Sequence, residues 1–222
     1  MAKTIETVRF TGDRTALYCR ERAAVLHKYA QIVVPETHVA FAVYGSGKIS
    51  KQLVGRCDVF GSNGPFESEG DTAAVDFVFV CADARINIDF RIDAERGNGA
   101  HVEASGSAEL CVGDCRALAE AVVASPEDDM MSRFEKRLDF ELKQELAVGG
   151  SHRELLSRMK VTVCAFAARE FGLVPTRFEI DRLTEHGIKE IDDDAARFCT
   201  ECGAPLVPEA KYCPRCGKKI GI

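Results

Sequence analysis

Residues 85–112 read RINIDFRIDAERGNGAHVEASGSAELCV, and this stretch decides the fold. In its first half Ile86, Ile88, Phe90 and Ile92 alternate with polar or charged residues, and a turn follows at 97–99 (GNG). The alternation resumes from residue 102 to residue 112. A period of two places every second side chain on the same face of a strand. The stretch therefore predicts two long antiparallel strands, with Gly106 marking a bulge or a close contact.

Shorter apolar runs precede this pair of strands. The run at 75–80 (VDFVFV) is nearly continuous, which is typical of a strand that is buried on both faces. Further candidate strands lie at 7–10, 16–19, 32–35, 39–43, 48–54 and 57–60. The glycine-rich stretch 55–70 otherwise predicts a surface loop.

Helical spacing follows the second long strand. We expect a first helix from a cap at Asp114 to about Ala124, a second that starts at 125–128 (SPED) and a third that opens with a capping box at 151–154 (SHRE). The apolar face of the second helix is predicted at Met131, Phe134, Leu138, Leu142 and Leu146. A last strand around residues 177–181 completes an α+β fold with a mainly antiparallel sheet and packed helices.

The chain ends in two matched cysteine pairs. Residues 198–203 read FCTECG and residues 212–217 read YCPRCG. Two cysteines separated by two residues can hold one face of a metal ion, and a following glycine permits the positive φ that turns N–H groups toward the thiolates. Four thiolates form a closed tetrahedral site, so we predict one structural Zn²⁺ bound by Cys199, Cys202, Cys213 and Cys216. The alternative is a redox-active Cys-x-x-Cys, which two matched copies disfavour.

These patterns divide the chain into three predicted parts. Residues 1–184 form the α+β domain, residues 185–197 a polar linker and residues 198–222 a zinc ribbon. A ribbon of this size cannot bury enough apolar surface to fold alone, so metal binding would supply its folding free energy, roughly 10–16 kcal/mol in comparable peptides. Asp192, Asp193 and Asp194 in the linker are interpreted as solvated carboxylates and not as a cation site, because adjacent carboxylates without another ligand repel one another.

Composition limits the class of protein. The chain has 222 residues, is 46% hydrophobic and carries a formal net charge of −6, which suits a domain with a real core and argues against a protein that coats nucleic acid. No apolar run approaches the roughly 18 residues that span a bilayer, and the first six residues lack the apolar core of a signal peptide. We therefore expect a cytoplasmic protein.

Charge also bears on the partner of the ribbon, since ribbons bind nucleic acid or protein. From Arg197 onward five Lys or Arg and two Glu give a formal charge of +3, and the four thiolates with one dication reduce this to about +1. So small a charge is weak for binding a phosphate backbone. A protein partner is favoured, and a nucleic-acid-binding zinc-ribbon adaptor is the alternative.

Catalytic signals are absent from the sequence. Residues 45–48 (GSGK) lack the earlier glycine and the following Ser or Thr of a phosphate loop, which favours a turn between strands. Cys111 and Cys115 lie near a predicted helix start, where a thiol can be activated, but no histidine is close in sequence. The six cysteines outside the ribbon are expected to be small packed side chains (Cys19, Cys57, Cys81, Cys111, Cys115 and Cys164). We expect no enzymatic activity.

The order of these features resembles a known family. The segments 32–49 (IVVPETHVAFAVYGSGKI), 75–80 (VDFVFV), 104–114 (ASGSAELCVGD) and 171–183 (FGLVPTRFEIDRL) are similar to an SPFH domain, found in the stomatin, prohibitin, flotillin and HflK/C proteins and also called band 7. The likeness covers residues 5–184 and, with the ribbon, is closest to the bacterial branch described as virion-core-protein-like.

The resemblance implies a strongly curved sheet, homo-oligomerisation and scaffolding, often at membranes, without catalysis. Residues 1–222 contain neither a membrane hairpin nor the long coiled coil that drives ring assembly in the wider family. We therefore expect a self-associating cytoplasmic scaffold or adaptor, whose membrane contact is peripheral, at the inner face, or made through a partner. A role in membrane or envelope stress is a further hypothesis.

Overall fold

The computed structural model describes residues 7–22, 26, 29–44, 47–60, 75–97, 99–124, 129–186, 197–198, 205–206, 212 and 215–219. The strands before the helices are β1 (Thr7–Arg9), β2 (Tyr18–Arg22), β3 (Gln31–Val33), β4 (His38–Val43), β5 (Arg56–Asp58), β6 (Asp76–Cys81), β7 (Arg85–Glu95) and β8 (His101–Val112). The helices are α1 (Cys115–Val123), α2 (Met130–Val148) and α3 (His152–Phe171). The strands after them are β9 (Leu173–His186), β10 (Arg197–Phe198) and β11 (Pro205–Leu206).

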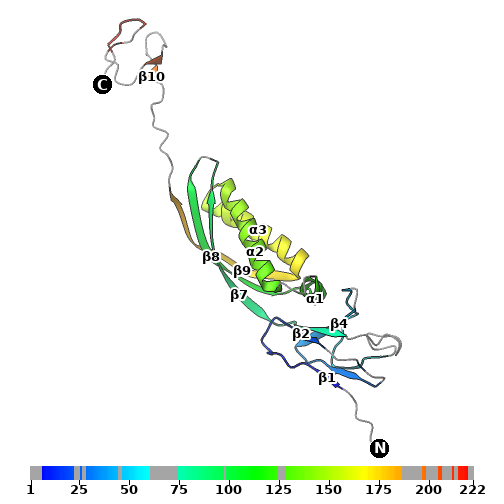
Figure 1. Cartoon of the computed structure of the whole chain (residues 1–222). Coiled ribbons are helices and arrows are strands. Elements are labelled where there is room, and N and C mark those ends of the chain that lie inside the picture. The colour runs from blue at the N-terminus through cyan, green and yellow to red at the C-terminus, as the bar shows by residue number, and fades with distance from the viewer. Residues whose placement is uncertain are drawn as a thin grey trace, which may run out of the picture.

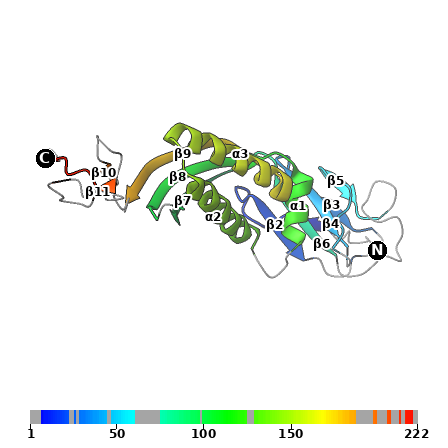
Figure 2. The same ribbon diagram turned by 90° about the horizontal axis from the view of Figure 1, so that it is seen from above.

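The predicted α+β class with mainly antiparallel pairing is confirmed. Three three-stranded sheets have the orders β1-β3-β5, β2-β6-β4 and β7-β8-β9, and within them only β1 and β3 pair in parallel. The first two sheets lie at one end, and α2 and α3 cover one face of the long sheet β7-β8-β9 (Figure 1). Strands β8 and β9 bend in an arc along these helices (Figure 2).

Strands β4 and β6 lie between two hydrophobic cores, which explains their continuous apolar sequence. Phe41, Val78 and Val80 point into the larger core beside the helices. Phe77 and Phe79 point into the smaller core beneath β3 and β5. Both faces of these strands are thus removed from water, as the run at 75–80 predicted.

Strand β8 organises the long sheet because it pairs with β7 on one side and β9 on the other. Its helix-facing residues are small at the centre: Ala104, Gly106 and Ala108 are all buried. A Cβ atom at Gly106 would lie 2.0 Å from the Glu179 carbonyl oxygen and 2.7 Å from the Phe90 ring. Gly106 is therefore required by close approach of the neighbouring strands, and the bulge or close contact predicted there is confirmed by a register shift beside it.

Two of the helix starts follow the sequence. Asp114 caps α1 by accepting hydrogen bonds from the N–H groups of Arg116 and Ala117, at 2.8 and 3.1 Å. Ser151 and Glu154 form the predicted capping box at the start of α3. Gly172 ends α3 in the left-handed conformation with φ of 64°.

The expected start of the second helix differs from the structure. The predicted capping segment, residues 125–128, lies outside the described residues, and α2 begins at Met130 with Asp129 as its cap. Met130 is buried and the predicted Met131 is only partly buried, whereas Phe134, Leu138, Leu142 and Leu146 line the core as expected. Asp129 also accepts a hydrogen bond from the Tyr18 hydroxyl at 2.5 Å. This bond joins β2 to the start of α2, and the local sequence does not encode it.

The strand predicted over residues 48–54 is wrong. The segment meets β4 only through isolated bridges, Val43 to Ile49 and Ala40 to Leu53. From the first bridge to the second, the segment advances four residues while β4 spans three, so the segment carries one residue more than its partner. The Ser50 side chain also accepts the Ala42 N–H at 3.0 Å, so a hydroxyl occupies a place in the ladder.

Replacing Gly106 with alanine tests the close approach at the centre of β8. We expect Gly106→Ala to lower the free energy of unfolding by about 1–3 kcal/mol, because the added Cβ meets backbone that cannot move alone. The matched control is Gly97→Ala, where the added Cβ meets no described atom within 4 Å apart from its chain neighbours. Urea unfolding followed by circular dichroism measures both, and equal stabilities would contradict this packing.

His38, at the start of β4, is a buried ionisable side chain next to the smaller core. It is 3% exposed, its ring packs on Phe10 at a centroid distance of 4.6 Å, and Nδ1 lies 2.9 Å from the Thr37 hydroxyl oxygen. Nε2 has no hydrogen-bond partner among the described residues. Loss of solvation, helped by the positive charge of Arg14, lowers the pKa of His38 below its ordinary value of 6.5.

The folded chain therefore resists protonation of His38, whereas the unfolded chain accepts the proton near pH 6.5. We expect stability to fall as pH drops below that value, with a slope of up to about 1.4 kcal/mol per pH unit. His38→Gln should flatten this slope, whereas His152→Gln, at an exposed position, should leave it intact. Urea titrations between pH 7 and pH 5 measure the slopes, and an unchanged slope in His38→Gln would contradict the assignment.

Candidate metal centre

The described residues near the carboxyl end form two pairings of equal span. Phe198 pairs with Pro205 in the β10–β11 ladder, and Tyr212 pairs with Lys219 in an isolated bridge. Each pairing encloses six residues, with cysteines at the first and fourth positions and a glycine at the fifth. The two Cys-x-x-Cys segments are therefore each flanked by two residues that pair with one another, and the flanking residues are the same number of positions apart.

The structure describes the end of the second loop. Cys216 is exposed at a turn, and Gly217 has a φ of 73°. The positive φ predicted for Gly217 is thus confirmed, while Gly203 lies outside the described residues. Cys199, Cys202 and Cys213 also lie outside them, so the four-thiolate arrangement stays a prediction.

The donor set fits zinc. The two enclosed segments supply four thiolates and no carboxylate or imidazole at the matched positions. Zn²⁺ accepts four thiolates in a tetrahedral arrangement and has no remaining position for a substrate. Within the described part of the chain, no group of three or more His, Cys, Asp or Glu side chains offers a second metal site.

The predicted packing of the other cysteines is confirmed only in part. Cys81 is buried, whereas Cys19, Cys57, Cys111, Cys115 and Cys164 are partly exposed. Burial raises the pKa of the Cys115 thiol, and the Asp114 carboxylate and Cys81 raise it further. Burial and the Glu21 carboxylate likewise raise the pKa of Cys19. The capping carboxylate next to Cys115 thus opposes the lowering of the thiol pKa that a helix start could otherwise give.

The other weak signals have structural accounts or lie outside the described residues. The backbone hydrogen bonds from the Tyr44 N–H to the Lys48 carbonyl and from the Gly47 N–H to the Tyr44 carbonyl, both 2.8 Å, favour the turn between strands predicted for residues 45–48. Gly45, Ser46 and Asp192 to Asp194 are not described. Among the described helices, none combines the length and the apolar character needed to cross a membrane.

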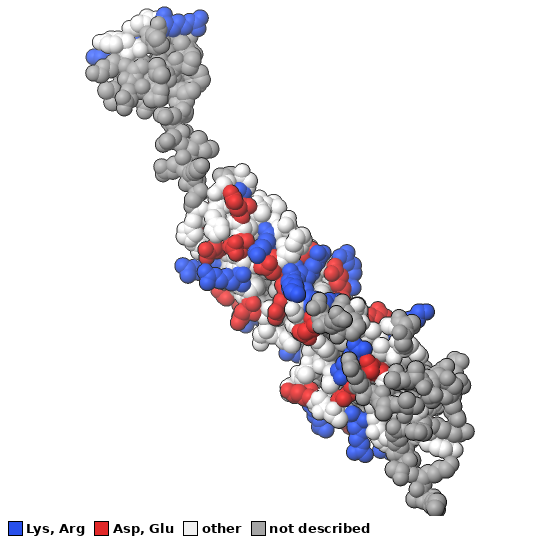
Figure 3. Space-filling model, in the orientation of Figure 1, with Lys and Arg blue, Asp and Glu red and all other residues white. Residues whose placement is uncertain are grey.

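The surface charge is mixed over the face shown in Figure 3. Lys and Arg side chains lie among Asp and Glu side chains along the described body of the molecule. Near the carboxyl end, Arg215, Lys218 and Lys219 are exposed. The positive groups of the tail are thus accessible, but they do not continue into a basic strip over the described residues of that face.

Comparison with known proteins supports the assignment of the tail. Residues 198–220 match the family model of a zinc-ribbon domain, and the matched range contains all four predicted ligands. No curated protein matches the chain. The carboxyl-terminal segment is therefore similar to modules that bind zinc and that contact nucleic acid or protein, and the resemblance of residues 5–184 to an SPFH domain stays a prediction.

Zinc content tests the site. We expect the purified chain to carry one zinc ion, and we expect Cys216→Ser to lower the occupancy and to make the tail sensitive to protease, because the ribbon depends on the metal for folding. Elemental mass spectrometry and limited proteolysis are the measurements. Cys164→Ser, which changes a cysteine on α3, should keep the full metal content. Full zinc in Cys216→Ser would remove Cys216 from the ligand set.

Proposed function

We propose that this protein is a non-enzymatic cytoplasmic scaffold or adaptor that self-associates and binds a protein partner through its zinc ribbon. The observation that carries the proposal is the match of residues 198–220 to a zinc-ribbon domain, with each cysteine pair enclosed by two paired residues of equal separation. A site of four thiolates leaves no open coordination position for a substrate. The role of such a zinc ion is structural: it holds the shape of a binding surface and does not bind a substrate.

A protein partner fits the charge of the ribbon better than a nucleic acid does. The segment from Arg197 to Ile222 has a formal charge of +3 before the metal site is counted, and the zinc–thiolate group lowers this to about +1. Phosphate-backbone binding draws its affinity from several released counterions, which requires several unbalanced cations. The exposed Tyr212, 59% accessible, is the kind of aromatic side chain that is enriched in protein interfaces.

Self-association is proposed from the resemblance to SPFH domains, and one feature of the long sheet supports it. Strands β7 and β9 are the outer strands of their sheet, so each has an edge whose N–H and C=O groups lack a partner strand within the described chain. Such edges can pair with another chain. Peripheral attachment to the inner face of a membrane, and a role in membrane or envelope stress, are likewise proposed only from the resemblance.

A pull-down from native cells tests the adaptor role. The full chain should retain partner proteins that the double variant Cys199→Ser/Cys202→Ser loses, because loss of zinc unfolds the ribbon. The matched control Cys57→Ser/Cys164→Ser changes two cysteines outside the ribbon and should retain them. Quantitative mass spectrometry compares the three baits. An identical partner set on all three would show that the ribbon does not bind the partners.

Size-exclusion chromatography with light scattering tests self-association, and a monomer at micromolar concentration would contradict it.

Fluorescence anisotropy with short DNA and RNA at low salt tests the alternative function, nucleic-acid binding. Salt-sensitive binding that disappears when Lys211, Arg215, Lys218 and Lys219 are replaced by alanine would make the protein a nucleic-acid adaptor.

A further inference from the structure

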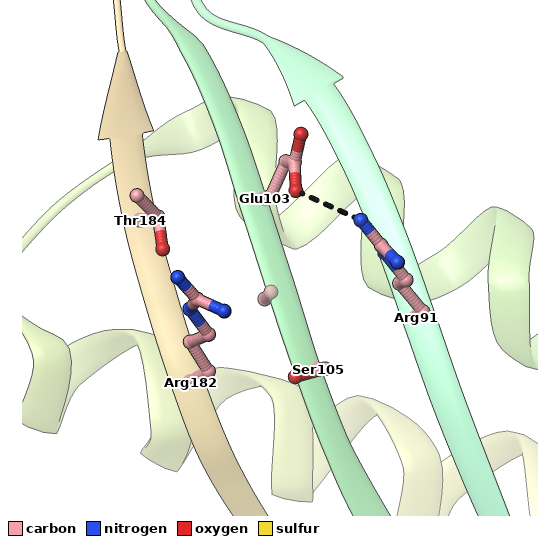
Figure 4. Close-up of a pocket in the computed structure, with 6 residues that line it drawn as sticks. Arg91, Glu103, Ser105, Arg182 and Thr184 are labelled. Carbon is pink, nitrogen blue, oxygen red and sulfur yellow. Dashed lines mark hydrogen bonds and ion pairs between the residues drawn. The ribbon is translucent and has the colours of Figure 1, made fainter.

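The open face of the long sheet brings two arginines to either side of a serine. Arg91 on β7 pairs with Ser105 on β8, and Ser105 pairs with Arg182 on β9. The two arginines are therefore two strands apart, roughly 10 Å between their Cα atoms. Ser105, a small side chain, stands between them; the Arg91 guanidinium is turned to Glu103, and the Arg182 guanidinium extends along β9 toward Thr184 (Figure 4).

A β-bulge places Arg182 on this face. The register shifts between Ser105, which pairs with Arg182, and Gly106, which pairs with Ile180, so Asp181 is an extra residue in β9. Strict alternation from the buried Phe178 would turn Arg182 toward the helices. The inserted residue reverses the phase, and Arg182 is exposed on the open face. The bulge thus places Arg182 on the same face of the sheet as Arg91, at the same level along the strands.

The side chains around Ser105 form a hollow with one unbalanced positive charge. It has a volume of about 130 Å³ and is lined by Arg91, Glu103, Ala104, Ser105, Arg182 and Thr184. Arg91 makes a long ion pair with Glu103, at 3.4 Å. Arg182 has no ion pair or hydrogen bond with any residue that the structure describes, although Arg177 on the same strand is paired with Glu179 at 2.9 Å.

We propose that this hollow binds the phosphate group of a small, soluble phosphomonoester. A guanidinium presents a planar fork of N–H donors that matches the oxygens of phosphate, and two forks facing one another can share a single dianion. The hydroxyl groups of Ser105 and Thr184 supply further donors at the rim. A bound anion also relieves the repulsion between the two guanidinium groups, which Glu103 balances only in part.

The charges around the hollow restrict the ligand to a small one. Asp89 and Asp93 on β7 and Asp181 on β9 are exposed near the row of Arg91 and Arg182. These carboxylates repel an extended anionic surface such as an acidic membrane or a nucleic acid, because such a surface would place further phosphates beside them. A single phosphate group inside the hollow meets two arginines and one carboxylate, Glu103, which leaves a net positive charge. The site is separate from the ribbon and does not depend on the proposed adaptor role.

A titration with inorganic phosphate, observed through the arginine side-chain N–H signals of the full-length protein by NMR, tests the site. We expect saturable shifts at Arg91 and Arg182, and about a tenfold weaker affinity in Arg182→Ala. The matched control is Arg177→Ala on the same strand and face, which should keep the wild-type affinity. Circular dichroism verifies that both variants fold. Shifts that stay linear with phosphate, or that are equal at Arg85 and Arg177, would overturn the proposal.

A second arm identifies the source of the phosphate group. Glycerol 3-phosphate should produce the same saturable shifts as inorganic phosphate, and vesicles of phosphatidylcholine with phosphatidic acid should not retain the protein in a flotation assay. Vesicle binding that Arg182→Ala abolishes would overturn the assignment to a small soluble ligand and would identify a lipid headgroup instead.

Discussion

The pairing of β8 on both of its edges is the interaction on which the larger half of the structure depends. Its central helix-facing positions hold Ala104, Gly106 and Ala108, so β8 places little side-chain volume beneath the helices that cover the sheet. At Gly106 the neighbouring strand approaches so closely that a single methyl group would strike the Glu179 carbonyl. Phe90 and Phe178 stack beside this position at a centroid distance of 5.3 Å, and α2 and α3 pack above the resulting layer. The β-bulge in β9 lies next to this close approach, and it turns the residues that follow it to the opposite face of the sheet.

Much of this fold is encoded locally. The alternation in residues 85–95 and 101–112 predicts both long strands and their buried face, and the capping box at Ser151 predicts the start of α3. The failures arise where a distant segment decides the outcome. The parallel pairing of β1 with β3 and the bridges of residues 48–54 depend on partners that no local pattern names. Asp129, and not the segment before it, caps α2, where the Tyr18 hydroxyl from β2 also meets its carboxylate. Burial, and then the hydrogen bond to Asp129, raise the pKa of Tyr18 to about 12.

The two candidate sites also differ in how far the local sequence predicts them. The ligands of the ribbon can be predicted from sequence because each pair of cysteines lies within four residues and because both pairs are followed by a glycine and preceded by an aromatic residue, Phe198 or Tyr212. The equal spans from Phe198 to Pro205 and from Tyr212 to Lys219 add a structural regularity to that repeat. The hollow at Arg91, Ser105 and Arg182 could not be found this way. It needs three strands in register and one inserted residue, and the alternating pattern of β9 alone turns Arg182 to the wrong face.

We propose that the carboxyl-terminal cysteines bind zinc in a closed structural centre, which would make the ribbon a binding module and not a reactive one. X-ray absorption at the zinc edge of the full-length protein measures this directly, since it counts the atoms bound to the metal and identifies them as sulfur or as lighter elements. We expect four sulfur neighbours at about 2.3 Å and no oxygen or nitrogen neighbour. A spectrum with three or fewer sulfur atoms and an exchangeable oxygen would contradict it, because an open position would give the zinc a chemical role.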